Sequence, residues 1–323
     1  MKIILKRIIG RIALLMACFV PIILTAPPVR AESPFMDAAT NPSFMRDVHV
    51  LSAGENRIDN AVVGDGQKSG MSYDYGFVAS NIWNNEHNQI LGGVQYGRRT
   101  FDQQLVLPDS MVMPERLDNV SAGLMYKHIT SGDWALSQAV SYTRSWTNSP
   151  SIDVKDTVDL VGLAAISHKP GEAWVFGYFF DQSTDTKNHF YPVIEYVNAA
   201  HDRWTITVGY PVLSASFSPH PDWALAGGGG ISVSYKVTEQ NFVHLSSGGD
   251  AWAYRLEGPN TKSVAYKAQN AVLGWTYLYF IDHRTVAVLN ANLGWEFDRK
   301  LGSDNTVSLD NAAVMGLNLS LSF

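Results

Sequence analysis

The most regular feature of the chain is a two-residue alternation of apolar and polar side chains, and it is clearest at the C-terminal end. Every second residue from Ala313 to Phe323 is apolar, and the residues between them are small or polar from Gly316 onward. Successive side chains of a β-strand point to opposite faces, so a period of two indicates a strand. The sequence therefore predicts a final strand that has one apolar face and reaches the last residue.

The same alternation recurs along most of the chain, with almost no helical periodicity between the segments. It predicts thirteen strands, at Ser69–Asn81, Asn88–Gln103, Asp118–Thr130, Trp134–Thr147, Asp156–His168, Ala173–Thr184, Phe190–Asn198, Trp204–Phe217, Trp223–Val237, Phe242–Leu256, Lys262–Ile281, Thr285–Arg299 and Leu309–Phe323. Closed bacterial barrels have an even number of strands, so one more strand is expected. Phe44–Ser52 provides a fourteenth strand, and twelve strands are the alternative if some segments merge.

Short and longer connections alternate between these segments. Membrane barrels show this pattern because their periplasmic turns are short and their outer loops are longer. Residues 131–133 and 282–284 are examples of the short connections, whereas residues 104–117 form a long one. The exception is Ser218–Asp222, a tight turn at a position where the alternation predicts an outer loop.

Residues 1–31 have the composition of a targeting segment. Basic residues precede an apolar run at Ile12–Ala26, and Val29–Ala31 places small residues at a cleavage spacing. The apolar run is shorter than the roughly 20 residues that a membrane-spanning helix needs, which disfavours a membrane anchor. We expect export with removal of residues 1–31, a periplasmic segment at 32–43 and a single barrel domain at 44–323.

The only cysteine, Cys18, lies in this segment, in a partial match to a lipoprotein processing site. The apolar residues that follow Cys18 disfavour lipidation, and the remaining chain holds no disulfide or thiolate metal ligand. Removal of residues 1–31 takes away five basic residues and no acidic one, which leaves 19 basic against 30 acidic residues and a net charge of −11. This balance disfavours a nucleic-acid partner. An exported chain of many short alternating segments is either a transmembrane barrel or a soluble β protein.

Four of the predicted strands have a tryptophan as their first or second residue, just after a tight polar turn. These residues are Trp134, Trp174, Trp204 and Trp223. Tryptophan favours the boundary between lipid and water, where its ring is buried and its N–H is hydrated. Three of the four fall on the same side of the predicted barrel, so we interpret them as an interface girdle. Aromatic residues that plug the ends of a soluble barrel are the alternative interpretation.

The C-terminal strand resembles the assembly signal of bacterial outer-membrane barrels, with Leu317, Leu319 and Leu321 before the terminal Phe323. The resemblance implies a closed antiparallel transmembrane β-barrel in contact with outer-membrane lipid, and it implies recognition of the last strand by the barrel-assembly machinery. In such a barrel the edge of the last strand pairs with the first strand, and lipid covers its apolar face. The segment Trp204–Gly230 is similar to an uncharacterised barrel family, which implies no particular activity.

Side chains between the lipid-facing residues of each strand are expected to point into the lumen. The candidates are Lys127, Asp159, Asp181, Glu195, Asn290, Asn292 and Glu296. Mixed charge of this kind either lines an aqueous path or fills a closed barrel with internal ion pairs. Arg144 has the lipid-facing parity of its strand, so we expect it to lie near an outer loop, because an arginine at the bilayer midplane costs roughly 2–4 kcal/mol.

One pair of residues raises the question of catalysis. His244 and Ser246 lie two apart on a predicted strand and resemble the His-x-Ser pair of small outer-membrane lipid A deacylases. Those barrels are shorter, and no orienting carboxylate is identifiable here. The glycines at 227–230 lack the lysine and the helix of a phosphate-binding loop, and the histidines show no metal-ligand spacing.

The sequence therefore predicts a channel or binding barrel for small solutes with no reactive centre, cofactor or metal. Two alternatives stay open at this point. One is a lipid-modifying hydrolase that uses His244 and Ser246, and the other is a structural or surface-interaction barrel with a filled lumen.

Overall fold

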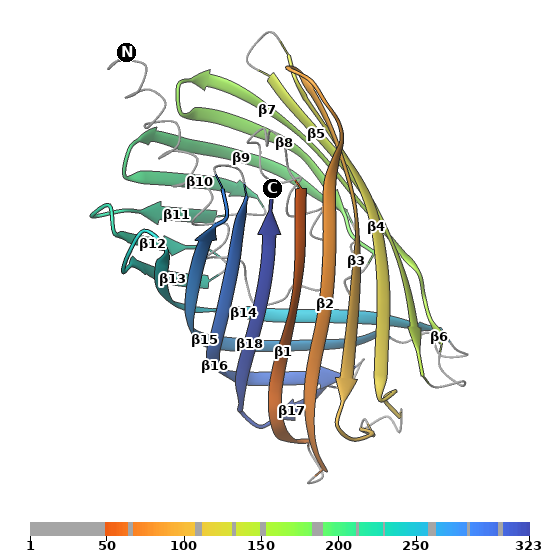
Figure 1. The fold of residues 1–323 in the computed structure, drawn as a ribbon. Coiled ribbons are helices and arrows are strands. Elements are labelled where there is room, and N and C mark those ends of the chain that lie inside the picture. The colour runs from red at the N-terminus through yellow and green to blue at the C-terminus, as the bar shows by residue number, and fades with distance from the viewer. Residues whose placement is uncertain are drawn as a thin grey trace.

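A computed structural model describes residues 49–63, 67–106, 112–130, 134–148, 153–182, 190–210, 213–228, 230–257, 263–282, 285–302 and 306–323. They form one antiparallel β-barrel (Figure 1). Its strands are β1 (His49–Val63), β2 (Gln67–Asn84), β3 (Asn88–Phe101), β4 (Arg116–Ile129), β5 (Trp134–Thr147), β6 (Asp153–Val154), β7 (Thr157–Lys169), β8 (Glu172–Phe180), β9 (Phe190–His201), β10 (Trp204–Tyr210), β11 (Leu213–Phe217), β12 (Trp223–Gly227), β13 (Gly230–Lys236), β14 (Asn241–Glu257), β15 (Ser263–Phe280), β16 (Val286–Gly302), β17 (Thr306–Leu309) and β18 (Ala312–Ser322). Within these ranges no helix is long and apolar enough to cross a membrane.

The last strand closes the barrel, as the terminal alternation predicts. β18 pairs with β1 from Val50 opposite Ser322 to Ile58 opposite Val314, and it pairs with β16 on its other side. β17 and β18 are two parts of one wall strand, because both pair with β16 and β1. The wall therefore holds sixteen strands, and β6 is an additional short strand.

The predicted number of fourteen strands, or twelve, is wrong, and two segments account for the difference. Trp204–Phe217 and Trp223–Val237 were each expected to be one strand, but each folds back on itself as the hairpins β10–β11 and β12–β13. In the sequence, Pro211 lies within the first segment and a run of glycines, residues 227–230, lies within the second. Proline removes a ladder hydrogen bond and glycine permits a sharp turn, so both favour an interruption of the strand.

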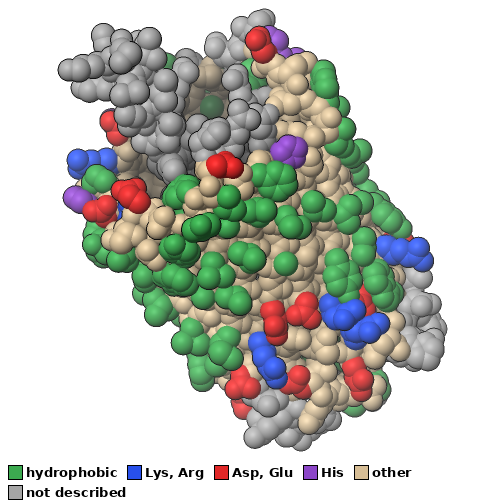
Figure 2. Space-filling model, viewed as in Figure 1, with side chains coloured by type: hydrophobic (Ala, Val, Ile, Leu, Met, Phe, Trp, Pro, Cys, Tyr) green, Lys and Arg blue, Asp and Glu red, His purple; other side chains and the backbone are tan. Residues whose placement is uncertain are grey.

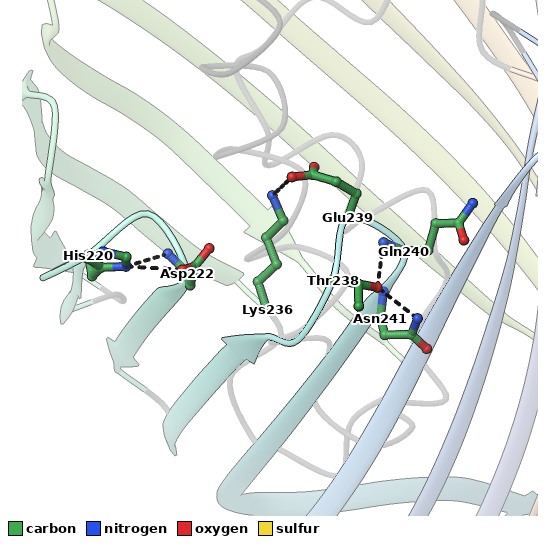
Figure 3. Close-up of polar contacts among 7 residues, drawn as sticks. All are labelled: His220, Asp222, Lys236, Thr238, Glu239, Gln240 and Asn241. Atoms are coloured by element: carbon green, nitrogen blue, oxygen red, sulfur yellow. Dashed lines mark hydrogen bonds and ion pairs between the residues drawn. The ribbon is translucent and has the colours of Figure 1, made fainter.

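The additional hairpins also remove the exception at Ser218–Asp222. This tight turn now lies at the same end of the barrel as the other short connections and both ends of the described chain. The backbone N–H of Asp222 donates to His220 Nδ1 at 3.3 Å within the turn (Figure 3). Of the predicted first strand, Phe44–Ser52, residues 44–48 lie outside the described residues, and β1 runs on to Val63.

The next short turn along the chain, between β13 and β14, is held by side-chain contacts that the sequence provides locally. Thr238 Oγ1 accepts hydrogen bonds from the backbone N–H groups of Gln240 and Asn241 at 3.3 and 3.1 Å (Figure 3). The ammonium of Lys236 donates to Glu239 at 2.7 Å across the same turn. We refer to this end of the barrel as the turn end and to the opposite end as the loop end.

The barrel wall extends less far along the barrel axis at β10, β11, β12 and β13, because these strands are short. β10, β11, β12 and β13 have 7, 5, 5 and 7 residues, whereas β2 and β15 have 18 each. A tilted strand needs about 9–11 residues to cross a bilayer. Because these four strands all start or finish at the turn end, their opposite ends stop part of the way toward the loop end.

Side chains alternate between an exposed outer face and a buried or half-buried inner face. On β5, Trp134, Leu136, Val140 and Tyr142 are exposed, as predicted. β2 is the exception. The predicted alternation of Ser69–Asn81 runs through Met71 and Tyr73 and makes them part of the outward apolar face. Both are buried inside the barrel and Val78 is exposed, so this predicted facing is wrong.

The loop-end parts of β14, β15 and β16 bend across the mouth of the barrel, and we call residues 250–257, 263–268 and 296–302 the lid (Figure 1). The register between β15 and β16 shifts between Lys267 and Gln269, and Asp298 opposite this shift has a φ of 47°. A β-bulge of this kind bends a strand and increases its twist. The bulge therefore lies where the lid leaves the wall.

Candidate lumen and mouth

Polar side chains cross the inner wall from β15 to β2 and hydrogen-bond to one another. Thr276 Oγ1 donates to Asn290 at 2.7 Å, and the Asn290 amide donates to Asn318 at 3.3 Å. The Asn318 amide in turn donates to Ser52 Oγ at 3.0 Å and to the Tyr75 hydroxyl at 2.5 Å. We call these five residues the polar belt. The predicted lumen residue Asn290 lies at its centre, and Asn318, Ser52 and Tyr75 were not predicted.

His244 and Asn292 extend the polar surface toward β14. Cα pairing places Gly274 between them, opposite His244 on one side and Asn292 on the other. A Cβ at Gly274 would lie 2.0 Å from His244 Nε2 and 2.5 Å from Asn292 Oδ1, so the two side chains converge over the space that a missing methyl group leaves. The predicted lumen residue Asn292 thus lies beside His244 over Gly274.

His244 and Ser246 both face inward on β14, His244 buried and Ser246 half-buried. The ring of His244 turns toward Gly274 on the neighbouring strand β15 and Asn292 on β16, the next strand along the wall. Within the described residues, the Ser246 side chain forms no hydrogen bond, and no carboxylate is hydrogen-bonded to His244. The arrangement is therefore a polar part of the inner wall, without the orienting carboxylate of a nucleophilic triad.

Four of the predicted lumen residues lie on other parts of the barrel, on or beside strands that carry no residue of the polar belt. Lys127 on β4 is buried near the turn end, and Asp159 on β7 is buried toward the loop end, where it accepts a hydrogen bond from the N–H of Gln182 at 2.9 Å. Glu195 is half-buried on β9, and Asp181 is half-buried just beyond the end of β8. These side chains do not form one cluster.

An apolar core fills the loop end beneath the lid. We call it the mouth core, and it consists of Ile58, Met71, Phe101, Leu105, Met113, Leu117, Val154, Tyr254, Val264, Tyr266, Ala268, Leu301, Ala312 and Val314. Leu105 and Met113 come from the long β3–β4 connection, where the N–H of Met113 donates to the carbonyl of Leu105 at 2.7 Å. Packed apolar side chains therefore lie between the lid and the wall at the loop end.

The tip of the lid reaches the far side of the barrel. β6, in the connection between β5 and β7, pairs with the end of β14 through Val154 opposite Leu256 and Asp153 opposite Glu257. β5 and β14 are diametrically opposed, since seven wall strands separate them along either path around the barrel. We call this two-pair contact the latch.

Buried polar side chains hold the lid on both of its sides. Arg99 Nη1 donates to the Tyr254 hydroxyl at 2.7 Å, and Asn119 Nδ2 donates to the same oxygen at 3.2 Å. At the bulge, Arg299 Nε donates to the Tyr266 hydroxyl at 2.9 Å and lies 3.3 Å from a Glu296 oxygen. The predicted lumen residue Glu296 is thus ion-paired at the base of the lid.

Sequence reasoning missed Arg99, Tyr254, Tyr266 and Arg299, although one signal was available. Arg99 has the inward parity of β3, and its neighbour Arg98 has the outward parity. A charged residue on the buried parity of a strand needs a partner inside the barrel. The partners come from strands that are distant in sequence, so the pattern of one strand does not identify them.

Asn270 lies where the mouth core meets the inner polar surface. It is buried on β15, and neither its side-chain oxygen nor its nitrogen is hydrogen-bonded to a described residue. His244 Nδ1 is also buried and is not hydrogen-bonded to a described residue. Buried polar groups in native proteins are nearly always hydrogen-bonded, so these groups are suited to contact water or a polar solute in the lumen. Among the described residues, no group of three His, Cys, Asp or Glu side chains is arranged to hold a metal ion.

The predicted tryptophans and the terminal strand face outward. Trp134, Trp174, Trp204 and Trp223 all lie at the turn end, because each is within the first three residues of a strand that follows a short turn, and all are exposed by 42–46%. Leu317, Leu319 and Phe323 are exposed on the outer face of the last strand, and Leu321 is half-buried there. All four tryptophans thus share one end, where three were predicted.

No family model and no curated protein sequence matches the chain. Among solved structures, the chain is similar to the translocator domain of the autotransporter NalP from Neisseria meningitidis, with a TM-score of 0.38, 11% identity and coverage of 89% of this chain and 91% of that one. It is also similar to an outer-membrane channel from Pseudomonas putida F1, with a TM-score of 0.40, 11% identity and coverage of 88% and 98%. A third similarity is to the toluene transporter TodX of Pseudomonas putida, with a TM-score of 0.41, 9% identity and coverage of 88% and 92%. Its own strand pairing makes this chain a closed antiparallel β-barrel.

Proposed function

We propose that the protein is an outer-membrane channel for small solutes, and that the closed mouth is a gate. The observation that carries this proposal is a polar belt on the inner wall between the turn end and the mouth core, together with a lid whose tip meets the opposite wall through the two-pair latch. A polar inner surface suits the passage or binding of a solute, and a small contact at the tip of a lid suits reversible opening.

The outer surface supports insertion in a membrane. Leu124, Ile194, Leu273 and Leu319 are exposed by 51–57% on strands all around the wall. Hydrophobic side chains form a band across the visible face, and charged side chains gather at the ends (Figure 2). A contiguous apolar surface of this extent is unfavourable in water, whereas lipid covers it without cost.

The size of the barrel supports a lumen. Barrels of 16–18 strands are wide enough to leave an aqueous channel, whereas barrels of eight strands are filled by side chains. The wall here has sixteen strands. The inner surface between the turn end and the mouth core carries polar groups such as Asn290, Asn318 and His244. We infer that water occupies this region and that solutes reach it when the mouth opens.

Apolar constrictions close channels because water leaves a narrow apolar space. The mouth core would provide such a constriction, and the lid would have to move for a solute to pass. Val154 belongs to both the mouth core and the latch, so opening of the latch and disruption of the core are coupled. Among the described residues, His244 and Ser246 have no orienting carboxylate, so we propose that the solute passes or binds without a reaction.

A reversible disulfide between the two strands of the latch tests the proposal. Residues 32–323 contain no cysteine, so a V154C/L256C pair, placed at opposed Cα positions, is the only disulfide that the barrel domain can form. Directly opposed residues of an antiparallel pair lie about 4.5–5.5 Å apart, within the range for a disulfide. We expect unitary current steps in planar bilayers under reducing conditions and their loss after oxidation.

An A139C/V161C pair is the matched control. These residues are opposed and buried in the wall between β5 and β7, away from the lid, so its oxidation leaves the current unchanged. If neither parent nor reduced variant shows current steps, the channel proposal is wrong and the barrel is a filled structural element. Steps that persist in the oxidised latch variant would contradict the lid as the gate.

A further inference from the structure

The outer face of the loop end carries an arginine cluster that the channel does not use. Arg98 on β3 and Arg116 on β4 share the buried carboxylate of Asp118, with Nε atoms 2.9 and 2.7 Å from its oxygens. The Tyr96 hydroxyl donates to the same carboxylate at 2.7 Å. Two arginines therefore share one carboxylate, and the three side chains together carry a formal net charge of +1.

Arg144 lies one strand away, on the outward face of β5. It is exposed and forms no ion pair or hydrogen bond with a described residue. Asp156 is the acid that follows β6, and its carboxylate accepts hydrogen bonds from the Tyr142 hydroxyl and from the N–H of Ser145. Asp156 thus orients its neighbours and leaves the Arg144 guanidinium available.

A groove lies beside the Arg144 side chain. It has a volume of about 600 Å³ and is lined by Val120, Ala122, Tyr142, Arg144 and Trp146. The small side chains of β4 form its floor, because Val120 is directly opposite Arg144 and Ala122 is opposite Tyr142. The groove therefore combines an apolar floor, two aromatic side chains and one available cation.

The depth of this groove in the membrane follows from the strand. Arg144 is ten residues from Trp134, which begins β5 at the turn end. A strand rises about 3.3 Å per residue and tilts by roughly 40°, so the two levels are roughly 25 Å apart along the membrane normal. The apolar band of such barrels is about 25 Å tall. If Trp134 marks one membrane boundary, Arg144 marks the other.

We propose that this groove binds a phosphorylated acyl lipid of the outer leaflet, with the phosphate at Arg144 and an acyl chain on Val120 and Ala122. Arginine forms strong charge-assisted hydrogen bonds with phosphate. Trp146 and Tyr142 flank the boundary between the polar and apolar parts of such a ligand, as aromatic residues do at membrane interfaces. This inference rests on the membrane insertion that the proposed function requires, and it is independent of any current through the lumen.

Native mass spectrometry of the purified full chain in detergent tests the proposal, with lipid A and fully dephosphorylated lipid A as probes. We expect saturable binding of lipid A and about tenfold weaker binding to R144Q, the loss expected for one charge-assisted contact. V120W, which fills the groove, lowers the binding of lipid A as well. R57Q is the matched control, because Arg57 is an outward-facing arginine on β1 away from the groove.

Equal binding of lipid A by the parent, R144Q and R57Q would overturn the proposal, and so would equal binding of the two lipids by the parent. Absence of bound lipid A on the parent would also overturn it. A shift in gel mobility on boiling verifies that each variant is a folded barrel. A folded parent that conducts but binds no lipid A disproves only the lipid site, whereas a parent without the boiling shift disproves the barrel and the channel.

Discussion

Arg99 and Tyr254 meet across the interior of the barrel, with Arg99 Nη1 donating to the Tyr254 hydroxyl at 2.7 Å although five wall strands separate β3 from β14 along the shorter path. The Arg99 guanidinium also lies 4.3 Å from the centre of the Tyr73 ring. A contact between opposite sides of a barrel exists only because the end of β14 leaves the wall. Arg99 therefore joins the fixed wall to the lid.

Substitution Y254F should favour the open mouth. It removes the hydroxyl that accepts hydrogen bonds from Arg99 and Asn119, and it retains the aromatic ring in the mouth core. Loss of a partner for a buried polar group costs about 1–3 kcal/mol, and this cost falls on the closed state, where Arg99 is buried. We expect a higher open probability in planar-bilayer recordings.

Y235F is the control for this experiment. Tyr235 is 40% exposed on the outer face of β13, and its ring contact with Trp223 does not need the hydroxyl. An identical open probability for Y254F and Y235F would show that the Arg99–Tyr254 contact does not hold the mouth.

Substitution G274A should narrow the lumen without unfolding the barrel. The new Cβ would lie 2.0 Å from His244 Nε2 and 2.5 Å from Asn292 Oδ1, and both atoms are at the ends of side chains that can rotate away. Their displacement into the lumen should lower the single-channel conductance and leave the boiling shift unchanged. G76A is the matched control for G274A, because a Cβ added at Gly76 has no other atom within 4 Å. A drop in conductance of the same size in G76A would contradict the assignment of this wall to the solute path.

The terminal Phe323 is expected to direct assembly and not only stability. Its N–H donates to the His49 carbonyl at 3.0 Å, and its ring is stacked on His49 with centroids 5.4 Å apart, so it also contacts the first strand. We expect F323A to accumulate less folded barrel in cells, while purified F323A refolds in detergent as the parent does. F280A tests specificity, since Phe280 ends β15 at the same end and is 40% exposed. Equal losses in cells for both variants would argue against a terminal assembly signal.

The wall of the barrel could be predicted from the sequence because each wall strand has a lipid side and a lumen side, which produces the period of two. The outward residues of β5 and β18 were identified for this reason. β2 was assigned the wrong facing because Met71 and Tyr73 are apolar for another reason, their position in or beside the mouth core. Alternation locates a strand, but it does not distinguish lipid from a buried core as the environment of the apolar face.

The lid could not be predicted, because it depends on contacts between distant segments. Glu296 was expected to line the lumen, and its parity was correct, but the bulge at Asp298 turns this part of β16 across the mouth, where Glu296 pairs with Arg299. The polar belt was found in part, through Asn290, because it lies on a regular stretch of wall. Its partners on β18, β1 and β2 became identifiable only from the closure of the barrel.

Insertion in a membrane predicts that two exposed isoleucines tolerate charge differently. Ile231 on β13 is 70% exposed and lies four residues from Tyr235, which is opposite the girdle residue Trp223. This spacing places Ile231 about 10 Å above the girdle, near the midplane of the apolar band. Ile82 is 64% exposed near the turn end of β2.

I231R should therefore lower the free energy of unfolding in lipid vesicles by roughly 2–4 kcal/mol, and I82R by only about 0–1 kcal/mol. Denaturant titration of both variants, followed by the boiling shift, measures the difference. Both isoleucines are exposed on the outer face. If the barrel were surrounded by water, both substitutions would therefore change the free energy of unfolding by small and similar amounts. That outcome would reject the membrane assignment, because the difference in cost arises only from depth in lipid.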